Sequence, residues 1–244
     1  MLTSIRSAFA ATLLAGSVFV AAPAAAQDGV TISGNASIVS DYRFRGVSLS
    51  GGDPAIQGGI DVETGSGFYV GTWGSSIDGG PLFGEMELDV YGGWSGEVSP
   101  GISVNVGAIA YLFPTNDFGP ADYGEVYASV SPSIGPAELT VGAAYAWDQD
   151  ALGNDDNLYL YSDLSVGVPT TPLTFNAHLG YTDGALAPDF LAGGLDDSGL
   201  DWSLGVSATL LGSLEVGVAY VGVEGTSVDG FTDDTVVATV GVSF

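Results

Sequence analysis

The sequence contains no cysteine and no lysine, and three arginines and one histidine are its only basic residues. The absence of thiols excludes disulfides and leaves no soft ligands for transition metals. With 29 acidic residues the formal net charge is −26, which excludes nucleic-acid binding, because that recognition depends on basic side chains that neutralise phosphates. P-loop, dinucleotide-binding and zinc-ligand spacings are also missing. We therefore predict neither a cofactor nor an enzyme.

Long apolar runs are confined to the N-terminus. The first residues carry one charge, Arg6, an apolar run follows, and Ala24-Ala25-Ala26 then provides a small-residue cleavage site. This pattern predicts a secretory signal peptide over residues 1–26. A membrane anchor is the competing interpretation, but the run is rich in alanine and is interrupted by Pro23. The expected mature chain, residues 27–244, is a single domain with a formal charge of 2 − 29 = −27.

Beyond the N-terminus the apolar residues alternate with small or polar ones. The segment from Leu173 to Thr182 places Leu, Phe, Ala, Leu and Tyr on one face and Thr, Asn, His, Gly and Thr on the other. Segments of this kind, each about ten residues long, are typical of strands that cross an outer membrane. We predict strands over 31–45, 54–64, 67–76, 84–96, 101–113, 122–132, 137–147, 157–168, 172–182, 200–211, 213–224 and 234–244.

The predicted connections alternate between short turns and longer polar loops. Short turns include Gly65-Ser66, Gly212-Ser213 and the stretch from Pro169 to Pro172. The longer loops lie near 46–53, 77–83, 114–121, 148–156, 183–199 and 225–233. Outer-membrane barrels have short periplasmic turns and longer external loops. The sequence therefore predicts an all-β fold, a transmembrane antiparallel up-and-down β-barrel of about twelve strands with both termini in the periplasm.

A soluble β-sandwich or barrel also alternates, but three features argue against it. Its polar faces normally carry lysine, which this chain lacks. The chain ends on Val240, Val242 and Phe244 in alternation, which resembles the C-terminal assembly signal of outer-membrane proteins. Aromatic residues fall near predicted strand ends, where interfacial girdles sit: Tyr42, Phe44, Phe68, Trp94, Tyr145, Trp147, Tyr181, Trp202 and Tyr220. We expect an outer-membrane location, with membrane lipid, periplasmic chaperones and the barrel assembly machinery as partners; no feature indicates a homo-oligomer.

Several motifs in the first half of the mature chain resemble one family. They are residues 40–48 (SDYRFRGVS), 53–55 (DPA), 57–59 (QGG), 67–69 (GFY), 71–75 (GTWGS), 87–89 (ELD) and 91–93 (YGG), with a looser match at Tyr123 and 125–127 (EVY). The chain is similar here to the TorF family, bacterial outer-membrane β-barrel proteins proposed to be porins. The resemblance implies a barrel and a pore, and it implies no particular solute.

The first predicted strand contains both basic residues that remain after cleavage. Alternation places Asp41, Arg43 and Arg45 on the lumen face and Tyr42 and Phe44 on the lipid face, because an arginine in lipid would cost about 2 to 4 kcal/mol. Two interpretations stay open. The arginines form a constriction opposite a carboxylate wall, or they belong to an interior salt-bridge network that plugs the barrel. The expected carboxylate partners on neighbouring strands are Asp61, Glu63, Glu87, Asp89 and Glu125.

The single histidine and the acidic loops are the remaining candidates. His178 lies on the predicted lumen face beside Asn176, and no serine of suitable context completes a catalytic triad, so we predict a hydrogen-bonded lumen residue. Acidic residues gather in two predicted loops and are weak candidates for Ca²⁺. They are Asp148, Asp150, Asn154, Asp155 and Asp156 in one loop and Asp196, Asp197 and Asp201 in the other. Their spacing does not fit an EF-hand.

Together these features predict a porin-like channel for passive diffusion of small polar solutes or ions, with a preference for cations. The alternative is a closed barrel that acts in structure or surface interaction through acidic loops that bind divalent cations or other envelope components.

Overall fold

The computed structural model describes residues 24–27 and 29–244. The predicted signal peptide falls almost entirely on residues 1–23, outside the described residues, and stays a prediction. Strand β1 (Ala24–Gln27) spans the predicted cleavage position and pairs antiparallel with the start of β2 (Val30–Val39). Among the described residues no helix is long and apolar enough to cross a membrane.

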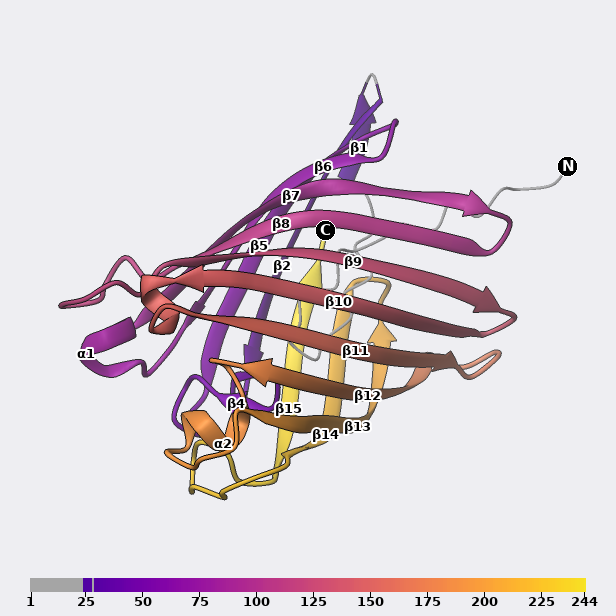
Figure 1. The fold of residues 1–244 in the computed structure, drawn as a ribbon. Helices are drawn as coiled ribbons and strands as arrows, with labels where there is room; N and C mark the ends of the chain where they lie inside the picture. The colour runs from indigo at the N-terminus through magenta and orange to yellow at the C-terminus, as the bar shows by residue number, and fades with distance from the viewer. Residues whose placement is uncertain (1–23, 28) are drawn as a thin grey trace, which may run out of the picture.

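Twelve of the described strands form one closed antiparallel barrel (Figure 1). After β2 the wall consists of β5 (Ala55–Thr64), β6 (Phe68–Ser76), β7 (Met86–Ser99), β8 (Ile102–Leu112), β9 (Tyr123–Ile134), β10 (Ala137–Gln149), β11 (Asp155–Gly167), β12 (Leu173–Gly184), β13 (Ser198–Leu210), β14 (Leu214–Val223) and β15 (Thr235–Ser243). Each wall strand pairs with the next, and β2 pairs with both β15 and β5, which closes the ring. Closure satisfies backbone groups that an open sheet edge would leave unpaired.

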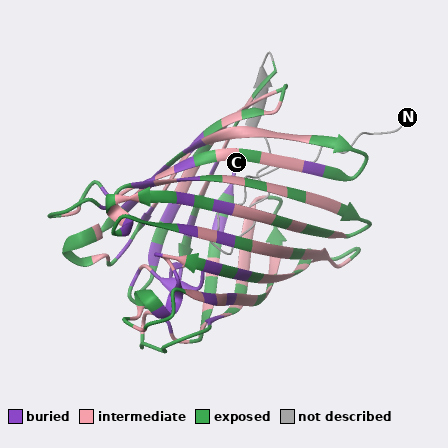
Figure 2. Ribbon diagram, in the orientation of Figure 1, coloured by how far each residue is buried: buried purple, intermediate pink, exposed green. Residues whose placement is uncertain are grey.

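Burial alternates along the strands (Figure 2), and the exposed positions carry mainly large apolar side chains, whereas the buried polar side chains lie inside the barrel. On β12, Leu173, Phe175, Leu179 and Tyr181 are exposed on the outside. His178 lies on the opposite, inner face. The faces predicted for this strand are therefore correct, because a period of two puts neighbouring side chains on opposite sides of a sheet.

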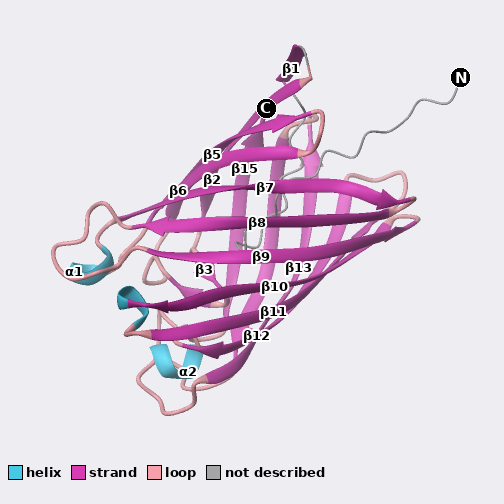
Figure 3. Ribbon diagram, turned by 45° about the horizontal axis from the view of Figure 1, so that its top comes forward, coloured by secondary structure: helices cyan, strands magenta, loops and turns pink. Residues whose placement is uncertain are grey.

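The two ends of the barrel differ. The short turns lie at the end where β2 begins and β15 ends, which we call the terminus end. The opposite loop end carries the long connections, including α1 (Gly80–Phe83), η1 (Asp150–Leu152) and α2 (Pro188–Leu191) (Figure 3). This division confirms the predicted alternation of short turns and long loops, and it brings all the long loops to one mouth of the barrel.

The first predicted strand is wrong beyond Val39. There the chain leaves the wall, and residues 40–54, the inserted segment, fold into the barrel before β5 begins. Inside it, β3 (Arg43–Phe44) and β4 (Val47–Ser48) pair as a small hairpin. The two turn residues between them have positive φ, 48° and 79°, which is the pattern of a tight two-residue hairpin turn.

Tyr42 and Phe44 consequently do not face lipid. Tyr42 is only 3% exposed and packs edge to face against Trp73 of β6, with ring centroids 5.4 Å apart. Phe44 packs against Tyr111 of β8 at 5.6 Å. Both faces of the hairpin are therefore interior, because the segment crosses the bore and does not extend the wall.

Inward glycines let the tyrosine side chains lie against the wall. A Cβ on Gly71 of β6 would lie 2.4 Å from Asp61 Oδ1 and 2.5 Å from Tyr91 Cε2, and one on Gly180 of β12 would lie 2.2 Å from Tyr159 Oη. These contacts are too close for any side chain larger than glycine. The inner surface is thus shaped by large rings packed over small residues.

Candidate functional site

The charged side chains that line the lumen are mainly acidic. Strand register places these carboxylates on the inner face: Asp61, Glu63, Glu87, Asp89, Glu97, Glu125, Glu138, Asp163, Asp201 and Glu215. On the strands described, His178 is the only basic residue of that face, and the inserted segment adds Arg43 and Arg45. Each wall residue predicted to face inward therefore does so. Glu97, Glu138, Asp163 and Glu215 were missed by the sequence analysis, although the same alternation contains them.

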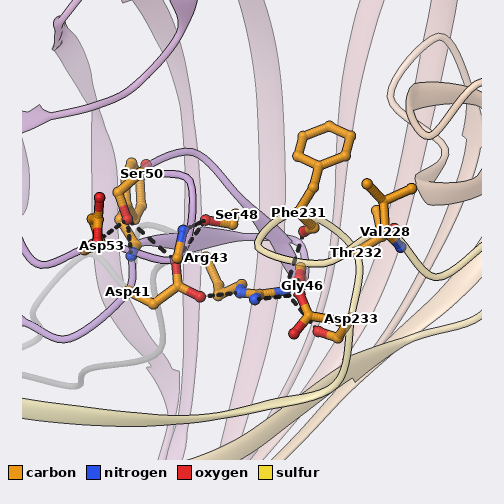
Figure 4. A network of polar contacts seen from close by, with 12 residues as sticks. Asp41, Arg43, Gly46, Ser48, Ser50, Asp53, Val228, Phe231, Thr232 and Asp233 are labelled. Atoms are coloured by element: carbon orange, nitrogen blue, oxygen red, sulfur yellow. Dashed lines mark hydrogen bonds and ion pairs between the residues drawn. The ribbon is translucent and has the colours of Figure 1, made fainter.

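Arg43 anchors the inserted segment to a loop at the mouth (Figure 4). Its Nε lies 2.5 Å from Asp41 Oδ2. Its Nη1 donates to the carbonyl oxygens of Gly46, Phe231 and Asp233, and its Nη2 donates to Asp233 Oδ1 at 3.2 Å. The side chain is 5% exposed. Every nitrogen of this guanidinium makes at least one hydrogen bond, so Arg43 holds the segment in place.

Asp41 organises the segment around that anchor. Its Oδ1 accepts hydrogen bonds from Ser48 Oγ at 2.6 Å and Ser50 Oγ at 3.2 Å, while Oδ2 faces Arg43. Ser50 Oγ in turn accepts from the backbone N–H of Tyr42 at 2.9 Å. These local bonds replace the ladder bonds that a continued wall strand would make, which explains why the chain turns inward here.

Arg45 reaches across the bore to the opposite side of the barrel. Its Nη2 lies 2.8 and 2.7 Å from the two carboxylate oxygens of Glu125 on β9, and both side chains are 1% exposed. The guanidinium carbon also lies 4.3 Å from the ring centroid of Tyr159 and 4.8 Å from that of Phe44. Of the predicted wall partners, only Glu125 pairs with an arginine of the described chain; Asp61, Glu63, Glu87 and Asp89 do not.

Glu87 and Asp89 lie side by side on β7 without a basic partner in the described chain. Tyr42 donates its hydroxyl to Glu87 Oε1 at 3.2 Å. Glu87 Oε2 and Asp89 Oδ1 are buried, and apart from the contact between the two carboxyl groups they have no hydrogen-bond partner in the described chain. The inner wall beneath the inserted segment therefore carries uncompensated acidic groups.

His178 is held between two carboxylates. Its Nδ1 lies 2.6 Å from Asp163 Oδ1 on β11, and its Nε2 lies 2.8 Å from Asp201 Oδ1 on β13. Tyr159 Oη is also 2.8 Å from Nε2. The prediction of a hydrogen-bonded lumen histidine is confirmed. Asp201 was assigned to an acidic loop and actually lies on the wall, 2% exposed, because β13 begins at Ser198.

A cavity of about 160 Å³ lies between the inserted segment and the wall formed by β11 to β15. Its polar lining includes Arg43 and Arg45 on one side and Asp163, His178 and Glu215 on the other. Glu215 makes no hydrogen bond or ion pair with a described residue. The space therefore presents a free carboxylate opposite arginines that are already paired.

The loop-end acidic residues do not gather into a metal site. No group of three or more histidine, aspartate or glutamate side chains in the described chain is arranged to hold a metal ion. The calcium candidates Asp148, Asp150, Asp155 and Asp156 lie on or beside η1, and Asp155 and Asp156 begin β11. These residues are close in sequence, but they form no such group in the described chain.

One loop carboxylate has a clear structural role. Asp189 of α2 accepts hydrogen bonds from Thr226 Oγ1 and the Thr226 N–H, both at 2.7 Å, and from the Asp196 N–H at 3.1 Å. These donors, led by the Thr226 hydroxyl, lower the pKa of the Asp189 carboxyl below its ordinary value. Asp189 thereby ties the loop after β12 to the loop after β14.

The C-terminal residues predicted to form an assembly signal lie on the outer face. Val240, Val242 and Phe244 are all exposed, and Phe244 exchanges two backbone hydrogen bonds with Gly34 of β2. Their side chains therefore face the surroundings of the barrel at the seam where it closes.

Comparisons with known proteins identify a family, and comparisons with solved structures identify a kind of fold. A family model described as "Bacterial protein of unknown function (Gcw_chp)" matches residues 23–244. No curated protein matches the sequence. The solved NanC porin aligns with a TM-score of 0.59 and 10% identity over 87% of this chain and 98% of that chain.

Two further channels have the same architecture. The KdgM porin aligns with a TM-score of 0.57 and 9% identity over 87% of this chain and 97% of that chain. An outer-membrane channel from Pseudomonas putida F1 aligns with a TM-score of 0.51 and 10% identity over 90% of this chain and 96% of that chain. The closed barrel is thus the fold of outer-membrane channels.

Proposed function

We propose that this chain, which belongs to the Gcw_chp family, is an outer-membrane channel for small polar solutes and ions. Members of the family are described as bacterial proteins of unknown function, so the role of the chain is inferred from its own lumen. The observation that carries the proposal is the cavity of about 160 Å³ beside the inserted segment. A twelve-stranded barrel is wide enough to enclose such a passage when one segment narrows it. The resemblance to the TorF family supports the same interpretation.

The charges of the lumen favour cations. Arg43 and Arg45 point inward as expected of a constriction, but both are paired with carboxylates, so neither presents a free positive charge. Glu215 and one oxygen of Asp163 remain open to the cavity. A narrow path between low-dielectric walls amplifies the field of such groups, which concentrates cations and repels anions.

The same charges argue against an acidic solute. One of the structurally similar channels, the KdgM porin, was solved in complex with oligogalacturonate, which is a polyanion. A lumen with unpaired carboxylates would repel a polyanion. We therefore assign this chain to neutral polar and cationic solutes.

Export and assembly complete the proposal. The N-terminal signal peptide would direct the chain to the periplasm, and the alternating C-terminal residues ending on Phe244 would be recognised by the assembly machinery. Insertion with both termini in the periplasm would place the long, acidic loops outside the cell. The outer face then contacts lipid through residues such as Phe175 and Leu204, which are 56% and 64% exposed.

Planar-bilayer recording tests the proposal directly. Purified, refolded protein is expected to give discrete openings, and a KCl gradient is expected to give a reversal potential on the cation-selective side. Glu215→Gln removes a free lumen charge and should lower that selectivity, whereas Glu85→Gln, at an exposed loop position, is the matched control. Anion selectivity would contradict the charge argument. Persistent silence from folded protein would favour the closed structural barrel.

A further inference from the structure

Arg45 occupies a turn position that its side chain type does not favour. Its φ is 48°, in the left-handed region, and Gly46 follows at 79°. This conformation is unfavourable for a residue with a Cβ, and asparagine, aspartate or glycine normally fills such turns. The contacts of the Arg45 guanidinium offset this backbone strain. The presence of arginine at this turn is therefore explained by its side-chain contacts and not by the turn conformation.

The guanidinium lies in a pocket built by three wall strands. Glu125 of β9 accepts from it with both oxygens, Tyr111 of β8 donates its hydroxyl to Glu125 Oε2 at 3.2 Å, and Tyr159 of β11 presents its ring face at 4.3 Å. A buried carboxylate with an aromatic face beside it is the arrangement that recognises planar organic cations. Three elements of the wall thus form a receptor for a guanidinium group.

Arg45 fits this pocket incompletely. Nη2 alone contacts both Glu125 oxygens, while Nε and Nη1 are buried and have no hydrogen-bond partner in the described chain. A guanidinium that is not tethered to the turn can rotate to place two nitrogens against the two oxygens, the stronger fork-to-fork geometry. Because Arg45 is attached to the short hairpin, its guanidinium does not reach the fork-to-fork geometry with Glu125 that the pocket allows.

The surroundings of the pocket carry further negative charge. Asp89 pairs in register with Tyr111, and Glu87 precedes it on the same inner face. Their buried atoms Glu87 Oε2 and Asp89 Oδ1 have no partner outside this carboxyl pair in the described chain, independently of the Arg45 contacts. These unsatisfied acceptors favour a cation with additional donors over a neutral ligand.

We propose that the pocket of Glu125, Tyr111 and Tyr159 is a binding site for solutes that carry a guanidinium group, and that Arg45 occupies it as an intramolecular surrogate. The inference deepens the proposed channel function by naming a solute class. Because Arg45 and Tyr159 also line the cavity beside the inserted segment, removing the Arg45 side chain opens the pocket to the lumen. A solute that competes with Arg45 would loosen the hairpin from the far wall.

The test is calorimetric titration of Arg45→Gly with methylguanidinium in detergent. Glycine accepts a φ of 48° without strain, so the hairpin is expected to keep its turn. We expect Arg45→Gly to bind methylguanidinium at least tenfold more tightly than the double variant Arg45→Gly/Glu125→Gln does, with no heat from urea, a neutral planar analogue. Equal affinity of the two variants, or equal heats from urea, would overturn the proposal.

A second variant guards against misfolding. If circular dichroism shows that Arg45→Gly is not folded, Arg45→Asn is used with the same ligands, because asparagine tolerates positive φ and is too short to reach Glu125. Calorimetry requires no ion flow. If the protein binds methylguanidinium but gives no openings in bilayers, the binding site is supported and the channel function is refuted. If it conducts ions but does not bind methylguanidinium, the channel function is supported and the binding site is refuted.

Discussion

Replacing Glu125 by glutamine is expected to release the inserted segment from the far wall while the barrel stays closed. The substitution leaves the Arg45 guanidinium buried, at 1% exposure, without a counter-charge. Breaking one partner of a fully buried ion pair costs about 3 to 5 kcal/mol. The glutamine oxygen still accepts a hydrogen bond and the ring faces remain, so we take about 3 kcal/mol, which corresponds to roughly a hundredfold at 1.4 kcal/mol per factor of ten.

This cost acts on the segment and not on the whole barrel. The wall is held by its strand ladders, and the contacts of residues 40–54 are additional to them. Local release of the segment therefore needs less free energy than global unfolding. The displaced population of Glu125→Gln should rise by the same factor of roughly a hundred.

Cysteine labelling measures that population, because the chain has no cysteine of its own. Val47 lies on the hairpin and is 2% exposed, so Val47→Cys reacts with a maleimide only when the segment leaves its position. When closing is faster than labelling, the rate follows the open population. We expect Val47→Cys/Glu125→Gln to label about a hundredfold faster than Val47→Cys alone.

Glu215→Gln in the Val47→Cys background is the matched control. It also removes one lumen carboxylate, but Glu215 holds no partner in the described lumen, so its labelling rate should stay within about a factor of two. An acceleration below about threefold for Glu125→Gln would refute the view that the Arg45 pair latches the segment. Equal acceleration by Glu215→Gln would show that net charge alone governs it.

Three further predictions follow from the packing and charges. Gly71→Ala places a Cβ 2.5 Å from Tyr91 Cε2 and should lower the free energy of unfolding in urea by about 1 to 3 kcal/mol, whereas Gly217→Ala, with its nearest atom at 3.6 Å, should change it little. Because hydrogen bonds lower the pKa of Asp189, its tie between the two loops should persist above the ordinary carboxyl pKa and weaken only as pH falls through the lowered value. Proteolysis of the loops across pH 2 to 6 should show that transition in the parent and not in Asp189→Asn. His178→Gln removes the group between two lumen carboxylates, so the reversal potential should shift further towards cation selectivity; a shift towards anions would contradict this.

The barrel wall could be predicted closely from the sequence. The segment predicted over 172–182 is β12, Leu173–Gly184, and that over 101–113 is β8, Ile102–Leu112. Each strand has one face towards lipid and one towards the lumen, so apolar and polar residues alternate along it with a period of two. This alternation can be recognised within each single segment of the sequence. Loop lengths added a second local signal, which placed both chain ends at the same mouth of the barrel.

The inserted segment could not be predicted in the same way. The run from Asp41 to Arg45 alternates charged and aromatic residues, and a wall strand and an interior hairpin both alternate. Of the two turn residues, only Gly46 is typical of a tight hairpin turn, because arginine is uncommon at positive φ. The turn at Arg45-Gly46 is therefore difficult to recognise from the sequence. The lumen orientation of the arginines was therefore right, but the lipid orientation of Tyr42 and Phe44 was wrong.

The sequence by itself determined the wall, its strand faces and the acidic character of the lumen, because these depend on residue order along single strands. Only the tertiary structure decided which charges meet. Arg45 pairs with Glu125 across 80 residues, and Arg43 pairs with Asp233 across 190. Such distances are bridged by ring closure and by the inward fold of residues 40–54, and no local pattern encodes which inward side chain lies opposite which other.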